Sequence, residues 1–231
     1  MGLKEDLEKE ISVIFKSKWE KRDGKTIPEP KDIKLSGNEG VRIKGTVLYA
    51  DLDGSTNMVD SYEPEFAAEI YKAYLYGTAK IINNEVGVIT AYDGDRIMAV
   101  YIGNSKNTDA ARTALKINYL VHQIINPLIK SLYSKSNFQV KQVVGIDTSD
   151  LLAAHTGVRG NNDLVWVGRA ANYAAKLTSL SEASSWITEE VFDSLDKSSK
   201  YSSENQIMWA RRTWASMSGI IIYQSNWWWE V

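Results

Sequence analysis

Length, composition and charge set the first limits on this protein. The chain has 231 residues, 44% of them hydrophobic and 24% charged, so it can form one sizeable domain and has the composition of a globular protein. It has no cysteine and two histidines, which excludes disulfides and thiolate chemistry and disfavours a histidine metal site, so any metal must be held by oxygen. A net charge of -2 lacks the basic surface of nucleic-acid-binding proteins, and a polynucleotide partner is not expected.

The N-terminal region predicts one helix followed by a connector. Apolar residues recur at spacings of three and four over roughly the first 20 residues, the pattern of an amphipathic helix: Leu3, Leu7, Ile11, Ile14 and Phe15. Residues 21–40 then hold two prolines and three glycines among charged residues. We therefore divide the chain into an N-terminal helix and connector over 1–40 and a main domain over 41–231.

No segment of the sequence is typical of a signal peptide or a membrane span. The N-terminus is charged throughout, and no stretch reaches the roughly 18 apolar residues that a membrane-spanning helix needs. We therefore expect a cytoplasmic protein without a membrane partner.

The main domain begins with a predicted strand, a tight loop and a helix. Residues 43–52 form an apolar run, and Gly54, Ser55 and Thr56 supply turn and N-cap residues for a helix that continues to Asn84. Two apolar strands follow, over 86–92 and 96–102. The Asp93-Gly94 pair between them is a strong signal for a two-residue hairpin turn, and it leaves Asp95 beside the turn.

The remaining elements complete a recognisable order. A long helix is predicted over 107–132, followed by strands over 139–147 and 151–158. Strand, helix, strand, strand, helix, strand is the order of an α+β fold of the ferredoxin-like (split βαβ) type. A helix over 169–180 and strands near 206–212 and 219–225 extend this core, and the serine-rich segments 179–185 and 198–203 are predicted to be loops.

Three acidic residues lie where strands end. Asp51 and Asp53 close the first strand of the main domain and Asp95 follows the hairpin turn, so carboxylates on neighbouring strands can converge on one Mg²⁺ or Mn²⁺ ion. The free backbone N–H groups of residues 54–56, at a helix N-terminus, suit a phosphate. A metal beside a phosphate predicts a nucleotide, although each of these aspartates taken singly is more often a solvated turn residue.

Four segments together resemble the class III nucleotidyl cyclases: LYADLDGST, TAYDGDRIMAV, GIDTSDLLAAHTG and VGRAANYAAKL. Their order and spacing match that family over roughly residues 43–180. The resemblance implies that Asp51 and Asp95 bind two catalytic Mn²⁺ or Mg²⁺ ions per site, with the Leu52 carbonyl as a backbone ligand. It also implies a nucleoside triphosphate as the substrate.

The fourth segment carries the remaining catalytic residues that the resemblance implies. Asn172 would orient the ribose, and Lys176 stands where the family has an arginine that neutralises charge at the α-phosphate. Lysine offers a point charge in place of a fork of donors, so turnover would be altered. In the family these residues and the metal aspartates come from opposite subunits, which implies a homodimer with two equal sites.

The positions that read the base in purine cyclases align with Ala91 and Val165. Neither side chain can form a hydrogen bond with a base edge, so neither purine code is present. Tyr49, Tyr92 and Trp166 add aromatic bulk near the expected base position, which favours a smaller pyrimidine. This combination resembles the bacterial pyrimidine cyclases of antiphage defence, which implies conversion of UTP or CTP to its 3′,5′-cyclic monophosphate as a second messenger, with UTP favoured.

Alternatives remain open at this point. The enzyme could instead be a cytidylate cyclase, or a catalytically degenerate domain that binds nucleotide as a regulator. The lysine that grips the terminal phosphates in many cyclases is absent before Tyr223, and Arg211 or Arg212 is the candidate replacement. A palm-type polymerase or diguanylate cyclase is disfavoured because its Gly-Gly-acidic-acidic-Phe hairpin is missing.

Overall fold

The protein divides into two compact units in its computed structural model, which describes residues 2–231. The first unit comprises the residues up to Lys44 together with Asp150–Gly168, and the second comprises Gly45–Ser149 and Arg169–Val231. The domain boundary that the sequence predicts at residues 40 and 41 remains a prediction. Among residues 2–231, no helix is both long and apolar enough to cross a membrane.

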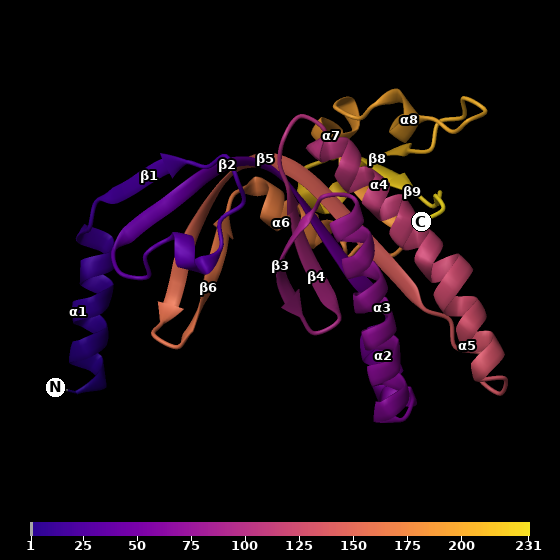
Figure 1. Ribbon diagram of the computed structural model, residues 1–231, viewed down its shortest axis with the longest axis horizontal. Helices are drawn as coiled ribbons and strands as arrows, with labels where there is room; N and C mark the ends of the chain where they lie inside the picture. The colour runs from indigo at the N-terminus through magenta and orange to yellow at the C-terminus, as the bar shows by residue number, and fades with distance from the viewer. Residues whose placement is uncertain (1) are drawn as a thin grey trace. The chain divides into compact units, whose positions relative to one another are not determined.

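A mixed sheet forms the centre of the second unit (Figure 1). Its strands run in the order β3-β4-β2-β5-β7-β9-β8. Their bounds are β2 (Asn38–Asp53), β3 (Val88–Asp93), β4 (Arg96–Tyr101), β5 (Lys141–Val158), β7 (Ser185–Thr188), β8 (Ala210–Trp214) and β9 (Ile220–Ser225). The neighbours β3, β4, β2 and β5 have the arrangement expected of a split βαβ core, so the predicted α+β fold class is confirmed.

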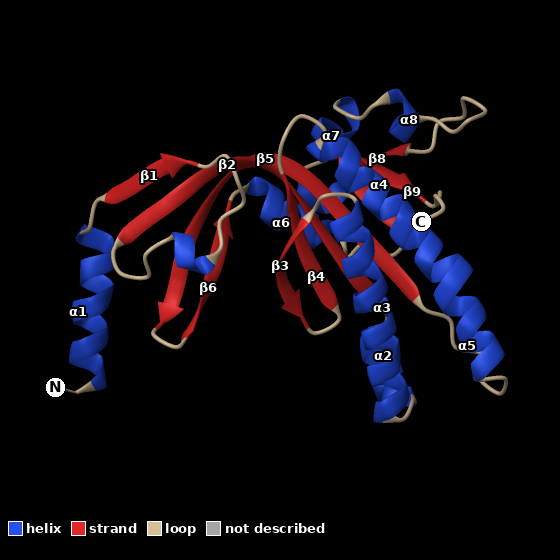
Figure 2. Ribbon diagram, in the orientation of Figure 1, coloured by secondary structure: helices blue, strands red, loops and turns tan. Residues whose placement is uncertain are grey.

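Helices cover both faces of this sheet. Their bounds are α2 (Ser55–Ser61), α3 (Pro64–Asn84), α4 (Lys106–Tyr119), a π-helical turn (Leu120–Ile125), α5 (Asn126–Leu132), α6 (Arg169–Leu177), α7 (Glu189–Asp193) and α8 (Lys197–Lys200) (Figure 2). Successive strand residues point to opposite faces. On β5, Val144 and Ile146 therefore pack in the core with α3 and α4, whereas Val143 packs in a second core with Leu177 of α6.

One glycine brings α6 against the sheet. A Cβ atom on Gly145 of β5 would lie 2.2 Å from the Ala174 carbonyl oxygen and 2.8 Å from the Leu177 Cβ. Any side chain at this position would push α6 away from the strand. The close contact between helix and strand backbone therefore requires glycine.

Several predicted boundaries differ from the observed ones for clear reasons. The helix expected over 54–84 is two helices because Pro64 starts a new one. The two strands expected over 139–158 are the single strand β5. Asp93 pairs with Arg96, so the hairpin turn consists of Gly94 and Asp95 rather than Asp93 and Gly94.

The serine-rich loop predictions were partly wrong. Ser185 begins β7, a strand of four buried residues between β5 and β9. Ser198 and Ser199 lie in the short helix α8. Four buried residues show no alternation of polar and apolar side chains, so periodicity could not reveal β7.

The first unit contains α1 (Leu3–Lys16), β1 (Trp19–Asp23), a 3₁₀ turn (Pro30–Asp32) and β6 (Asn161–Val167), with parts of β2 and β5. β1 pairs in parallel with β2, and β6 pairs antiparallel with β5. The predicted N-terminal helix is present but ends at Lys16, and β1 covers the end of the predicted helix and the start of the predicted connector. The sequence also missed β6, whose short turn at Val158–Asn161 was not recognised as a hairpin.

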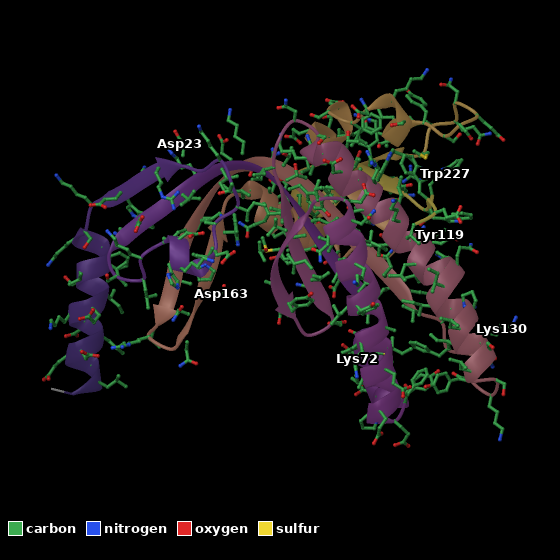
Figure 3. All side chains as sticks on the ribbon, viewed as in Figure 1. Asp23, Lys72, Tyr119, Lys130, Asp163 and Trp227 are labelled. Carbon is green, nitrogen blue, oxygen red and sulfur yellow. The ribbon has the colours of Figure 1, made fainter. Side chains whose placement is uncertain are left out.

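The C-terminal segment packs against α4 in the second unit. The Asn118 side chain donates hydrogen bonds to the carbonyls of Asn226 and Trp227, each at 3.0 Å. The Trp229 N–H donates to the Leu115 carbonyl at 3.2 Å. Figure 3 labels Tyr119 and Trp227, which mark this part of the molecule. The tryptophan-rich end therefore extends the α4 side of the core.

Candidate active site

The predicted metal ligand Asp51 lies near the end of β2, on the sheet face that carries α6. Its neighbours Ala50 and Leu52 pack in the core with α3 and α4, so Asp51 points to the opposite face. Arg96 of the adjacent β4 donates to Asp51 Oδ2 from Nη2 at 2.7 Å and from Nε at 3.1 Å. The Thr178 hydroxyl lies 3.5 Å from the same oxygen. Thr178 follows α6, so strand ends and this helix meet at the site.

Asp95 occupies the β3–β4 turn next to Asp51. Gly94 has φ +61°, a left-handed conformation that glycine adopts without strain, and it directs the turn so that Asp95 is half-buried. Among the described residues, Asp95 Oδ2 is buried without a hydrogen-bond partner. Burial raises the pKa of Asp51, and the Asp95 charge raises it further, whereas Arg96 acts in the opposite direction.

This pair of carboxylates fits a divalent cation. A buried acidic oxygen without a donor lacks compensation for its charge, and a hard cation would supply it. Over residues 2–231, no group of three or more His, Cys, Asp or Glu side chains is placed to hold a metal ion. Two carboxylates would therefore need backbone, water or substrate oxygens to complete the coordination shell of the ion. The Leu52 carbonyl, directly after Asp51 in the chain, is the predicted backbone ligand.

The loop predicted to bind phosphate lies at the start of α2. Gly54 has φ +77° and caps the helix, which begins at Ser55. Ser55 is half-buried and Thr56 is exposed. Because the first N–H groups of a helix have no partner within it, these residues offer donors directly after the strand that carries Asp51.

Asn172 and Lys176 lie one turn apart on α6, and both are exposed. Lys176 Nζ is 3.7 Å from the Met217 sulfur. Their exposure leaves both polar groups able to contact another molecule. Arg211 and Arg212, the candidate phosphate ligands, lie exposed on the edge strand β8.

The aromatic residues expected near the base divide between the two units. Tyr49 is half-buried on β2, with the Arg96 guanidinium carbon 6.0 Å from its ring centre. Burial raises the pKa of Tyr49, and the Arg96 charge lowers it. Tyr92 is exposed on β3. Trp166 belongs to the first unit, where its indole nitrogen is buried without a partner among the described residues.

Two residues at this site were missed by the sequence analysis. Arg96 follows Asp95 directly, which was a signal that it lies near the predicted metal ligands, but its contact with Asp51 depends on the pairing of β4 with β2. Thr178 gave no such signal because it comes near the aspartate only through the packing of α6. The structure thus brings Tyr49, Asp51 and Asp95 together around Arg96.

Comparison with known proteins identifies the family, although no family model matches the chain. Over its full length it is 52% identical to a uridylate cyclase of Xanthomonas perforans and 50% identical to one of Burkholderia cepacia, and the match covers 100% of each relative. The chain belongs to the class III nucleotidyl cyclases. This cyclase is therefore an enzyme of the lyase class.

The fold agrees with this assignment. The crystal structure of the adenylyl cyclase CyaB from P. aeruginosa matches this cyclase with a TM-score of 0.67. The match covers 81% of this cyclase and 95% of the CyaB chain. The sequences are only 22% identical, so the likeness concerns the fold. The predicted cyclase catalytic fold is confirmed.

Proposed function

We propose that this cyclase converts UTP to 3′,5′-cyclic UMP and pyrophosphate. The observation that carries the proposal is the identity of 52% and 50%, over the whole chain, to two proteins named uridylate cyclase. The aliphatic side chains of Ala91 and Val165 support it. A buried polar base edge left unpaired costs about 1–3 kcal/mol, so purines would bind poorly against them.

The metal-binding part of the site would consist of Asp51, Asp95 and the Leu52 carbonyl. Bound Mn²⁺ or Mg²⁺ ions would activate the ribose 3′-hydroxyl and stabilise the charge of the leaving pyrophosphate. Two hydroxyl groups would position Asp51. The Tyr74 hydroxyl donates to the Asp51 carbonyl at 3.5 Å, and the Thr178 hydroxyl lies 3.5 Å from Asp51 Oδ2. The N–H groups of Ser55 and Thr56 would bind phosphate oxygens.

Asn172 and Lys176 would act on the transition state. The Asn172 amide orients the ribose so that its 3′-oxygen faces the α-phosphorus, and the Lys176 ammonium balances the charge that grows on the α-phosphate. Their exposure supports a homodimer in which each chain offers α6 to the metals of its partner. Neither site would then be complete in a single chain.

Base selection would combine size with missing hydrogen bonds. Tyr49 and Tyr92 would narrow the space for a two-ring base, and Ala91 would offer no hydrogen bond to a purine edge. Together these effects are worth ~3–5 kcal/mol, or a factor of several hundred or more in kcat/KM against a purine.

The test is incubation of the pure cyclase with an equimolar mixture of the four nucleoside triphosphates and Mn²⁺, followed by chromatography. We expect cyclic UMP as the main product. Cyclic CMP as the main product would instead identify a cytidylate cyclase. Cyclic AMP or cyclic GMP would overturn the pyrimidine specificity, and the absence of any cyclic product would favour a nucleotide-binding regulator.

The resemblance to pyrimidine cyclases of antiphage defence extends the proposal to the cell. We expect cyclic UMP to rise after phage infection and to act as a second messenger for a separate effector. Plaque counts on bacteria that carry the cyclase with its neighbouring genes, compared with an Asp51→Asn variant, test this role. Equal plaque counts in both strains would contradict it.

A further inference from the structure

A buried ion pair fixes the start of α6. The Asp147 carboxylate on β5 is fully buried, and its two oxygens accept hydrogen bonds from Arg169, the first residue of α6, at 3.0 and 3.1 Å. The Thr188 hydroxyl donates to the same carboxylate at 2.6 Å. Because the arginine fork makes two parallel hydrogen bonds, the contact fixes direction as well as distance.

Further contacts hold Arg169 in one orientation. Its Nη2 atom also donates to the Thr148 carbonyl at 2.9 Å, and Nη1 donates to Glu190 of α7 at 2.5 Å. The N–H of the next residue, Ala170, donates to the Ser149 hydroxyl at 3.0 Å. The first turn of α6 is therefore tied both to β5 and to α7.

We propose that Asp147 and Arg169 are positioning residues, whose ion pair sets the place of α6 and thereby of Asn172 and Lys176. This inference rests on the proposed function of those two side chains. They follow Arg169 by three and seven residues on a helix of nine residues, so a shift at its start moves both. A misplacement of about 1 Å can cost about a hundredfold in rate.

The first test compares substitutions at Arg169. Arg169→Met keeps an unbranched stem and removes the guanidinium, and we expect kcat to fall between about tenfold and a hundredfold while KM for UTP changes less than about threefold. Arg169→Lys keeps the charge without the fork and should recover part of the rate. A rise in KM with kcat unchanged would overturn the positioning role.

A second test separates positioning from folding stability. Arg169→Met leaves Asp147 as a buried charge without its arginine, which by itself destabilises the fold. The double variant Asp147→Leu/Arg169→Met removes both charges, so its urea midpoint should return toward wild type while kcat stays low. Recovery of kcat together with stability would mean that the pair is only structural. If the double variant remains unstable, the kcat of Arg169→Lys decides between the two roles. A kcat partly recovered from that of Arg169→Met would support the positioning role.

A third readout does not require activity. In Arg169→Met, the α6 amides should exchange their hydrogens at least about tenfold faster than in wild type. The matched control is Arg112→Met, which removes an arginine of α4 whose Nε lies 3.3 Å from the buried carboxylate of Glu85. It should leave α6 exchange and kcat unchanged. Faster α6 exchange in an enzyme inactive on every nucleotide would reject the proposed function alone, whereas unchanged exchange would overturn the positioning role.

Discussion

At the scale of single residues, Asp51 and Arg96 form the closest ion pair of the candidate site. Asp51 Oδ2 accepts hydrogen bonds from two nitrogens of Arg96, and the proposed cation would bind the same carboxylate. Asp95 lies in the β3–β4 turn, and its Oδ2 is buried without a hydrogen-bond partner among the described residues. The two aspartates therefore differ: one is balanced by an arginine, and the other is left without a donor.

Replacing Asp51 with asparagine tests the metal assignment. Asp51→Asn removes a negative ligand, and we expect kcat/KM to fall at least about a thousandfold even at saturating Mn²⁺, because metal stabilisation is worth several kcal/mol. Mn²⁺ binding, followed by electron paramagnetic resonance, should weaken in parallel. Asp60→Asn, a change at an exposed acid on α2, is the control and should leave both unchanged. Near-full activity of Asp51→Asn would refute the assignment.

Gly145 tests the close packing of α6 on β5. In Gly145→Ala, the new methyl group would overlap the Ala174 carbonyl, and overpacking of this kind costs about 1–3 kcal/mol in the free energy of unfolding. Urea denaturation measures the loss, and the cyclase rate should fall because α6 moves. Gly2→Ala, where the nearest atom is 4.0 Å away, should match wild type in both measurements. Unchanged stability of Gly145→Ala would contradict the packing.

At the scale of elements, the C-terminal segment supports α4. The Tyr119 and Trp228 rings lie 5.5 Å apart, and Trp229 packs on the core formed by α3 and α4. Asn118 is buried and holds the segment through two backbone carbonyls. The final residues therefore belong to the fold rather than to a loose tail.

Asn118→Ala should loosen this segment. Loss of two hydrogen bonds in a buried setting costs about 1–3 kcal/mol, so the urea midpoint should drop and a protease should cut the C-terminal residues sooner. Gln123→Ala, at an exposed position in the neighbouring π-helical turn, serves as the control. Equal stability and equal protease resistance of the two variants would show that the segment contributes little.

At the scale of the whole molecule, the homodimer proposal predicts complementation. An Asp51→Asn chain lacks a metal ligand and a Lys176→Ala chain lacks the cation, so each homodimer is inactive. If every site uses one chain for its metals and the other for Lys176, random mixing should restore about a quarter of the wild-type sites. The cyclase rate of the mixture measures this fraction. A mixture as inactive as its parts would mean that sites are not shared.

The sequence by itself determined the order of the core elements and the motifs, although it missed β1, β6 and β7. The two main helical regions, the β3–β4 hairpin and the start of α2 at Ser55 followed from periodicity and turn residues, which are local properties of the chain. The likeness of four segments to cyclase motifs identified Asp51 and Asp95 as candidates for the same site. Element boundaries were less accurate, as the break at Pro64 shows.

Only the tertiary structure decided how these elements meet. The Arg96 contact with Asp51 spans 45 residues, and the ion pair of Arg169 with Asp147 spans 22. A sequence pattern records which residues share a face but not which distant side chain packs opposite them. The short buried strand β7 was invisible for a related reason: its pairing with β5 and β9, rather than any alternation of its own, makes it a strand.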